Sequence, residues 1–242
     1  MMVRFTVPDI YAVWSKSADT RFCSTSGGAF TEFAKAIIAD GGCVAGAKYN
    51  NENLVEHDLI DNLEDIEKLR QSKYMSSSMG DIYKRVKAEL ASGRLVGFCG
   101  SPCQVAGLYS FLGKEYDNLF TMDFICRGMN SPKAFKAWMN EIEHQEGSKV
   151  TKVWFKYKEG GWKTSPRRTR LDFENGSHRV YEDEDIPIFN IFPIQPHHFL
   201  KVRNITSPTN LPQPSNPWFY RQSCPVMQFI EICFRYQWWP GS

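Results

Sequence analysis

The sequence lacks the features that mark several large classes of protein. Its 242 residues contain no apolar run of about 18 residues, so no transmembrane helix is expected. Its first residues lack the apolar core of a signal peptide. Basic residues number 29 and acidic residues 27, a balance that provides no basic surface for a nucleic-acid backbone. The seven cysteines, an odd number scattered along the chain, argue for a reducing, cytoplasmic location and against a disulfide framework.

The clearest pattern lies in residues 94–131. Leu95 to Cys99 is an apolar run of strand length, ended by a Gly-Ser-Pro turn signal. Apolar residues then recur every three or four positions up to Gly113, which predicts a helix. Leu119 to Ile125 predicts a second strand, and Ser131-Pro132 predicts the start of a second helix. This alternation is typical of a crossover unit in a parallel sheet.

The pattern changes after residue 147. Apolar and polar residues alternate from Val150 to Tyr157 and from Thr169 to Phe173, and Asn175-Gly176 is a strong hairpin signal. We therefore predict an α/β fold with a mixed, largely parallel sheet flanked by helices. An antiparallel β-hairpin layer is appended to it.

Two cysteines, Cys103 and Cys126, each follow one of the predicted strands. Adjacent parallel strands end at one edge of the sheet, where ligands of open α/β sheets bind. The amides of a helix start favour a thiolate, so Cys103 is a candidate nucleophile or metal ligand. From spacing alone, both cysteines could equally be small apolar fillers of the core.

Residues Gly100 to Phe135 read GSPCQVAGLYSFLGKEYDNLFTMDFICRGMNSPKAF and resemble the coenzyme F420 hydrogenase/dehydrogenase beta-subunit family, C-terminal domain. That family reads G-T-P-C-Q-x-A-G-L, L-G-K-x-Y-x-N-L and D-x-x-C-H-G-x-x-S-P. Here Ser101 replaces the usual Thr, and Arg127 replaces the usual His. The resemblance spans Tyr11 to about Asp185. It implies an oxidoreductase that moves electrons between an iron–sulfur donor and FAD, then to coenzyme F420 or another organic acceptor. A ferredoxin-like or other electron-transfer partner is implied as well.

A small polar loop precedes the helical stripe that starts at Phe30. It consists of Ser24, Thr25, Ser26, Gly27 and Gly28. Hydroxyls and amides at a helix start make an anion site, although N-capping by a serine with glycines for packing explains the pattern as well. The resemblance favours cofactor binding, because the loop fits the family motif S-S-G-G-x-F in a part similar to a flavin-nucleotide site.

A second polar loop contains Ser72, Lys73 and Tyr74 and is similar to the family segment G-S-K-Y-V-Q-S. The resemblance implies that Lys73 pairs with a pyrophosphate or a flavin carbonyl and that Tyr74 stacks on a ring. The alternative is a solvated lysine and a half-buried tyrosine. Gln104, in the G-S-P-C-Q motif, completes the predicted cofactor contacts.

The resemblance also implies that Cys103 and Cys126 ligate a 4Fe-4S cluster. Such a cluster needs about four thiolates. Relatives add a P-S-C-x-x-C segment, whose spacing Cys224 and Cys233 lack, and many carry a C-x-x-C-x-x-C run that is missing here. The ligand set is incomplete, so FAD is the better supported cofactor.

The chain changes character at residue 186. Residues 186–242 hold 9 of the 13 prolines and 5 of the 56 charged residues, a composition that forbids long regular elements. We therefore divide the chain into a family-like α/β domain (1–185) and an atypical Pro- and aromatic-rich tail (186–242). We interpret the tail as a frame-shifted or otherwise aberrant C-terminus. A Cys-x-x-Cys in another reading frame of the coding DNA past Asp185 would support this.

Three functions are consistent with the sequence. The leading one is an FAD-dependent oxidoreductase module of the family. The second is a non-catalytic or truncated remnant that docks onto a partner. The third is a thiol-dependent enzyme with Cys103 as nucleophile, for which only His57 and His144 precede the hairpins as a base.

Overall fold

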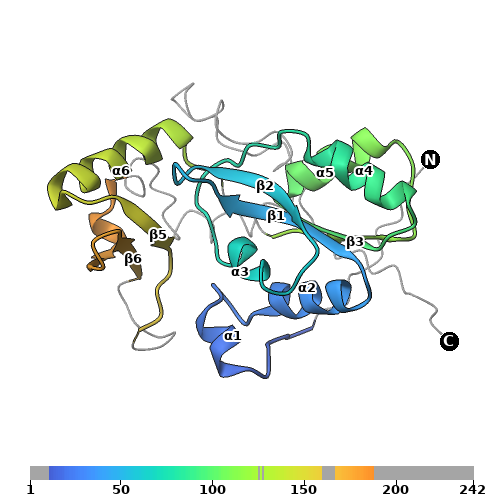
Figure 1. The fold of residues 1–242 in the computed structure, drawn as a ribbon, viewed down its shortest axis with the longest axis horizontal. Coiled ribbons are helices and arrows are strands. Elements are labelled where there is room, and N and C mark those ends of the chain that lie inside the picture. The colour runs from blue at the N-terminus through green and yellow to red at the C-terminus, as the bar shows by residue number, and fades with distance from the viewer. Residues whose placement is uncertain (1–10, 125, 127, 160–166, 188–242) are drawn as a thin grey trace, which may run out of the picture.

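The computed structural model describes residues 11–124, 126, 128–159 and 167–187 (Figure 1). Its main sheet has the strand order β2-β1-β3-β4. The strands β1, β3 and β4 are parallel, and β2 is an antiparallel edge strand. Their bounds are β1 Cys43–Tyr49, β2 Val55–Ile60, β3 Val96–Cys99 and β4 Leu119–Met122. The predicted mixed, largely parallel sheet is confirmed.

Helices cover both faces of the main sheet (Figure 1). Their bounds are α1 Ala18–Phe22, α2 Ala29–Ala39, α3 Ile66–Leu69, α4 Ile82–Ala91, α5 Pro102–Leu112 and α6 Pro132–Glu146. Strand side chains alternate between the faces. Val96 and Phe98 pack with α4 and α5, whereas Val44 packs with α2 and α3.

A second sheet has the antiparallel order β5-β6-β7, and it confirms the predicted hairpin layer. Its bounds are β5 Val150–Trp154, β6 Arg168–Phe173 and β7 His178–Glu182, and a 3-10 turn follows over Asp183–Asp185. Phe135, Trp138, Phe155 and Leu171 are buried between this sheet and α6. Val55 of β2 belongs to the same cluster, which ties the layer to the main sheet.

Two local predictions are wrong. The apolar pattern from Ile10 to Ser15 predicts a strand, but the described part of it forms none and makes a single backbone bond, from Ser15 N to Gly27 O (2.7 Å). The loop predicted over Arg21 to Gly28 begins only at Cys23, because Arg21 and Phe22 are the last residues of the short helix α1. The Ser17 hydroxyl caps it by accepting from Thr20 N at 3.1 Å.

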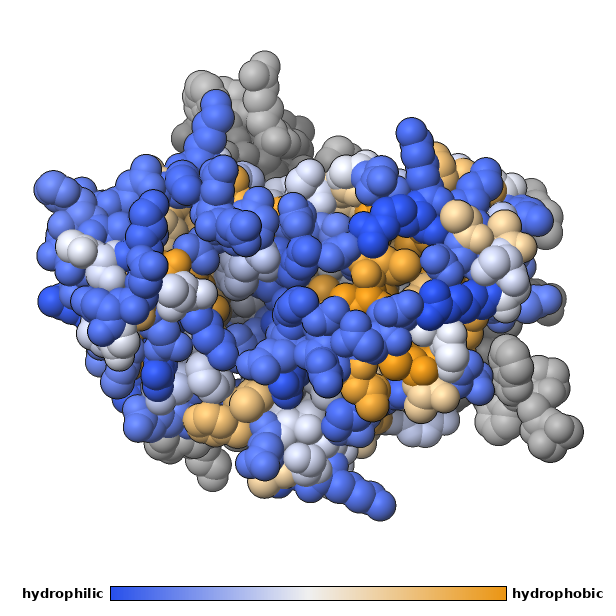
Figure 2. Space-filling model, in the orientation of Figure 1, coloured by the Kyte–Doolittle hydropathy of each residue, from blue (hydrophilic) through white to orange (hydrophobic). Residues whose placement is uncertain are grey.

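Polar side chains cover most of the face in Figure 2, and apolar side chains are visible over the main sheet. None of the helices in the described ranges is both long and apolar enough to cross a bilayer. Residues 188–242, including Cys224 and Cys233, lie outside the described part. The prediction of a separate, aberrant tail therefore stays a prediction.

Candidate functional site

The parallel strands β3 and β4 end side by side. Cys99, the last residue of β3, pairs with Met122, the last residue of β4. Cys103 and Cys126 each follow these paired strand ends by four residues. The second strand, predicted from Leu119 to Ile125, ends at Met122, so Cys126 does not follow it directly as expected. Cys103 is the second residue of α5, and both cysteines are half-buried.

The two predicted cofactor loops lie against each other. Thr25 Oγ1 accepts a hydrogen bond from Ser72 N at 2.7 Å. Gln71 Nε2 donates to Cys23 O at 3.2 Å. Segments 47 residues apart in the sequence therefore form one surface.

The next part of the second loop is fixed to the edge of the main sheet. His57 N donates to Ser78 O at 2.9 Å, and Ser78 N donates to Val55 O at 2.8 Å. Ser76 N also donates to Asn130 O at 3.3 Å, just beyond Cys126 in the chain. These bonds bring the loop after β4 to the loop after α3.

The Ser–Gly loop, Ser24 to Gly28, is closely packed on its own chain. The buried Ser24 hydroxyl donates to Thr20 O at 2.6 Å. A Cβ at Gly27 would lie 2.8 Å from Val13 O, and Gly28, with φ of +86°, is itself the N-cap of α2. The glycines therefore serve packing, and neither serine caps α2.

The buried Lys158 joins the hairpin layer to this loop. Its Nζ donates to Arg21 O at 2.7 Å and to Ser26 O at 3.1 Å. Burial lowers the pKa of Lys158 to about 8. Phe22 packs beside it on Trp154, with ring centroids 5.4 Å apart.

Lys73 is engaged within the protein as well. Its Nζ donates to the carbonyl oxygens of Leu69, Arg70 and Gln71 at 3.3, 2.8 and 3.4 Å, at the carboxyl end of α3. It also lies 5.5 Å from the centroid of the Tyr49 ring. Burial lowers the pKa of Lys73 to about 7, and the electrostatic effect of the nearby Cys99 opposes this shift. Lys73 is thus neither solvated nor free to pair with a pyrophosphate in this conformation.

Tyr74, the third predicted contact in this loop, is half-buried and packs edge-on against Phe155 at 5.1 Å between centroids. The nearby Cys99 thiol is buried, which raises its pKa to about 12 and keeps it protonated.

Gln104 is held by two bonds at the start of α5. Its Oε1 accepts from Ser101 N at 2.9 Å, and its Nε2 donates to Ser77 Oγ at 2.7 Å. The same Ser77 oxygen lies 2.9 Å from His57 Nδ1. The sequence motifs did not mark His57 or Ser77 as contacts of this site. His57 alternates with Val55 and Leu59 along β2, and a polar residue between these apolar positions was the available signal.

A family model for the C terminus of the coenzyme F420 hydrogenase/dehydrogenase beta subunit matches residues 93–225, more than half of the chain. The chain belongs to this family. The match includes Cys103, Gln104 and Cys126 and extends to residue 225, past Asp185, where the resemblance described above ends. The Ser–Gly loop and Lys73 precede the match, so their cofactor roles stay predictions.

One similar solved structure is a chain of the F420-reducing [NiFe] hydrogenase complex from Methanosarcina barkeri, studied with xenon. The two are 19% identical, with a TM-score of 0.47 over 72% of this chain and 60% of that chain. The present chain thus spans less than two thirds of that hydrogenase chain. No curated protein matches this sequence.

The described cysteines do not fit the iron–sulfur cluster implied by the family. Among the residues that the structure describes, no group of three or more His, Cys, Asp or Glu side chains is placed to hold a metal ion. Cys103 and Cys126 supply two of the roughly four thiolates that such a cluster needs.

The residues fit a flavin nucleotide in part. The Ser24 hydroxyl and Lys73 amine are engaged in bonds to backbone carbonyls. Two buried polar atoms close to them, Tyr49 Oη and Arg70 Nε, have no hydrogen-bond partner within the described part of the chain. Both can donate, to a carbonyl oxygen or to a phosphate. An open cavity of about 370 Å³ also lies between β2, Ser76 to Ser78 and Pro132.

Proposed function

We propose that this chain is an FAD-dependent electron-transfer module of the F420 hydrogenase/dehydrogenase beta-subunit family. It takes electrons from an iron–sulfur donor and passes them to coenzyme F420 or another organic acceptor. The observation that carries the proposal is the bond between Thr25 and Ser72. It joins the two loops that the family motifs assign to the flavin, and the second of these continues to Ser76, whose N–H donates to Asn130 O beyond Cys126.

The protein part of this function is binding and orientation. FAD supplies hydride and electron chemistry when bound. Tyr49 and Arg70 would donate to it from buried positions, and an unpaired buried donor costs about 1–3 kcal/mol until a ligand accepts from it. The exposed Ser26 is the loop residue with room for a phosphate.

The two described thiols are too few to hold a cluster. The donor cluster would therefore belong to another protein or be completed by residues outside the described part of the chain. Cys103 and Cys126 would then face that cluster. A ferredoxin-like partner meets this requirement, because its cluster carries its own ligands.

The visible spectrum of protein purified without oxygen tests the proposal. We expect the two visible absorption bands of a bound flavin, or their appearance after addition of FAD. Tyr49→Phe and Arg70→Gln should weaken FAD retention roughly tenfold each, about 1.4 kcal/mol. Lys68→Gln, an exposed lysine of α3, is the matched control. A colourless protein that binds no added FAD would contradict the proposal.

A docking remnant is the second candidate, and one observation favours it. Tyr11, Val13, Trp14 and Phe22 are exposed apolar side chains near the Ser–Gly loop, whose Ser24 hydroxyl is already engaged with Thr20 O. A remnant would bind a partner electron-transfer protein and no flavin. The same spectrum separates the two functions.

A further inference from the structure

A continuous path of hydrogen bonds links His57 on β2 to Cys103 on α5. His57 Nδ1 lies 2.9 Å from Ser77 Oγ, and Gln104 Nε2 donates to the same oxygen over 2.7 Å. At the other end, Ser101 Oγ donates to Gln104 Oε1 over 3.0 Å and lies 3.1 Å from Cys103 Sγ. Three separate segments of the chain supply these five side chains.

A backbone carbonyl fixes the direction of the bonds at the His57 end. His57 Nε2 lies 3.1 Å from Cys99 O, and because a carbonyl only accepts, Nε2 carries the ring proton. Burial lowers the pKa of His57, the Cys99 carbonyl opposes this shift, and the Lys73 charge adds to it. In the neutral ring Nδ1 is then the acceptor, so the Ser77 hydroxyl must donate to it.

A backbone amide fixes the direction at the other end. Ser101 N donates to Gln104 Oε1 at 2.9 Å, which turns the amide nitrogen of Gln104 toward Ser77. The only hydroxyl proton of Ser101 also points to Oε1, so the Ser101 oxygen accepts from the Cys103 thiol. Two independent backbone anchors therefore give every bond of the path one consistent direction.

Two members of the path are buried and the other three are half-buried. His57 is 7% exposed and Ser101 is 0% exposed, whereas Ser77, Gln104 and Cys103 are half-buried. The His57 ring is stacked on Phe98, with centroids 5.5 Å apart, so the plane of the imidazole is fixed as well. A path with buried members and few alternative partners responds to the loss of one member more strongly than exposed pairs do.

We propose that His57 is a positioning residue for Cys103. As the neutral Nε2–H tautomer it orients the Ser77 hydroxyl, which holds the Gln104 amide and through it the Ser101–Cys103 pair. The path itself follows from the geometry, and its use in holding Cys103 for electron transfer rests on the proposed function.

Nuclear magnetic resonance of the ¹⁵N-labelled full-length chain tests the tautomer directly. We expect His57 to be neutral at neutral pH with its proton on Nε2. The exposed His144 is the control for a histidine in contact with solvent. A His57 that is protonated, or that carries its proton on Nδ1, would overturn the proposal, because Nδ1 could not accept from Ser77.

Hydrogen exchange of the Ser101 amide tests the path, since this amide donates to Gln104 Oε1. In place of His57, Asn can put an acceptor where Nδ1 was, within reach of the Ser77 hydroxyl. The longer Gln puts its amide near the former position of Nε2 instead. We expect His57→Gln and Ser77→Ala to speed this exchange roughly tenfold or more, and His57→Asn to stay near wild type. Ser76→Ala, at the exposed neighbouring serine, is the matched control.

Equal exchange in Ser77→Ala and Ser76→Ala would overturn the proposal, as would equal effects of the two His57 substitutions. Melting temperatures show whether each variant is folded. If the His57 variants fail to fold, Ser77→Ala, which removes a single hydroxyl, still tests the path. None of these measurements needs a flavin. Their failure is thus distinguishable from failure of the proposed function.

Discussion

Two helix starts in this chain look alike in sequence and are built differently. α2 follows the Ser–Gly loop, and α5 follows Gly100-Ser101 and begins at Pro102. At α2 no side chain caps the helix, and the loop is fixed by the close approach of Gly27 to the backbone of Val13. At α5 the Gln104 side chain accepts from Ser101 N, and further side chains continue that bond to β2. Steric fit therefore determines the first start, and directed hydrogen bonds determine the second.

The difference shows that the composition of a loop does not determine whether its polar groups are available to a ligand. Small polar residues before a helix predict an anion site because their amides and hydroxyls can donate. In the Ser–Gly loop the Ser24 hydroxyl donates to Thr20 O, and the Ser26 carbonyl accepts from Lys158. A ligand at this loop must therefore use other donors, and Arg70 Nε and Tyr49 Oη are two buried donors without a partner in the described part of the chain.

The largest expected effect on stability comes from adding a side chain at Gly27, where steric fit fixes the start of α2. Gly27→Val places a Cβ at 2.8 Å from Val13 O, and a backbone atom cannot turn aside as a side chain can. We expect a loss of about 3 kcal/mol in the free energy of unfolding, measured by urea denaturation. Ser26→Val, at the exposed neighbouring residue, should change it by about 0.5 kcal/mol or less. Unchanged stability with lost FAD would show instead that Gly27 faces a ligand.

Substitutions of the cysteines near the ends of β3 and β4 give the next largest effect on stability. Cys99→Ser buries a hydroxyl in place of a protonated thiol and should cost about 2 kcal/mol. Cys103→Ser and Cys126→Ser change half-buried side chains, so stability should fall by about 0.5 kcal/mol or less while electron transfer is lost. Melting temperature, bound flavin and bound iron are measured for all three. Identical behaviour of the three variants would mean that Cys103 and Cys126 are core residues.

A smaller effect tests whether the hairpin layer holds the Ser–Gly loop. Lys158→Met keeps most of the side-chain volume and removes the donor to Arg21 O and Ser26 O. Because water can reach part of this region, we expect a loss of about 1 kcal/mol. Proteolysis should become faster within the loop. Lys133→Met, at an exposed lysine of α6, is the control, and equal proteolysis of the two variants would contradict the role of Lys158.

Much of the main sheet follows from the sequence alone. The pattern from Cys43 to Tyr49 predicts a strand, and β1 has those bounds in the structure. Its first residues are apolar and small, and they pack between two layers of helices. The strand predicted over Ile10 to Ser15 fails for the opposite reason. Tyr11, Val13 and Trp14 are exposed, so their apolar pattern does not report a buried face.

The candidate site is only partly predictable. The motifs locate its loops, and the order of the strands brings Cys103 and Cys126 to one edge. The partners of Lys73 and His57 depend on tertiary contacts that no local pattern encodes. Lys73 meets the end of α3, and His57 meets a serine 20 residues away. It is thus easier to predict which residues belong to the site than whether their polar atoms already have hydrogen-bond partners.

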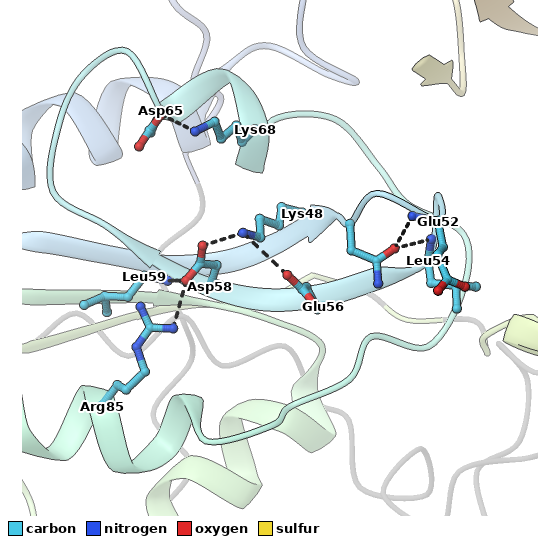
Figure 3. A network of polar contacts seen from close by, with 10 residues as sticks. Lys48, Glu52, Leu54, Glu56, Asp58, Leu59, Asp65, Lys68 and Arg85 are labelled. Carbon is cyan, nitrogen blue, oxygen red and sulfur yellow. Dashed lines mark hydrogen bonds and ion pairs between the residues drawn. The ribbon is translucent and has the colours of Figure 1, made fainter. Parts of the chain in front are cut away.

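The smallest expected effect on stability concerns a network of charged side chains that lies outside both helix starts. Asp58 on β2 lies between Lys48 and Arg85, at 2.6 and 2.8 Å (Figure 3). Burial alone would raise the pKa of Asp58, but the hydrogen bonds from these two cations outweigh it and hold the pKa at about 2.

Because this pKa lies below the ordinary value of 3.8, the folded state binds the Asp58 proton less readily than the unfolded state. The resulting stability is fully present above about pH 4 and is lost as the pH falls through 2. We expect Asp58→Asn to flatten the decline of unfolding free energy between these values by less than about 1 kcal/mol, since the group is partly exposed. Asp40→Asn, an exposed carboxylate after α2, should leave the decline unchanged. An identical decline in wild type and Asp58→Asn would show that the network of Figure 3 contributes nothing measurable to stability.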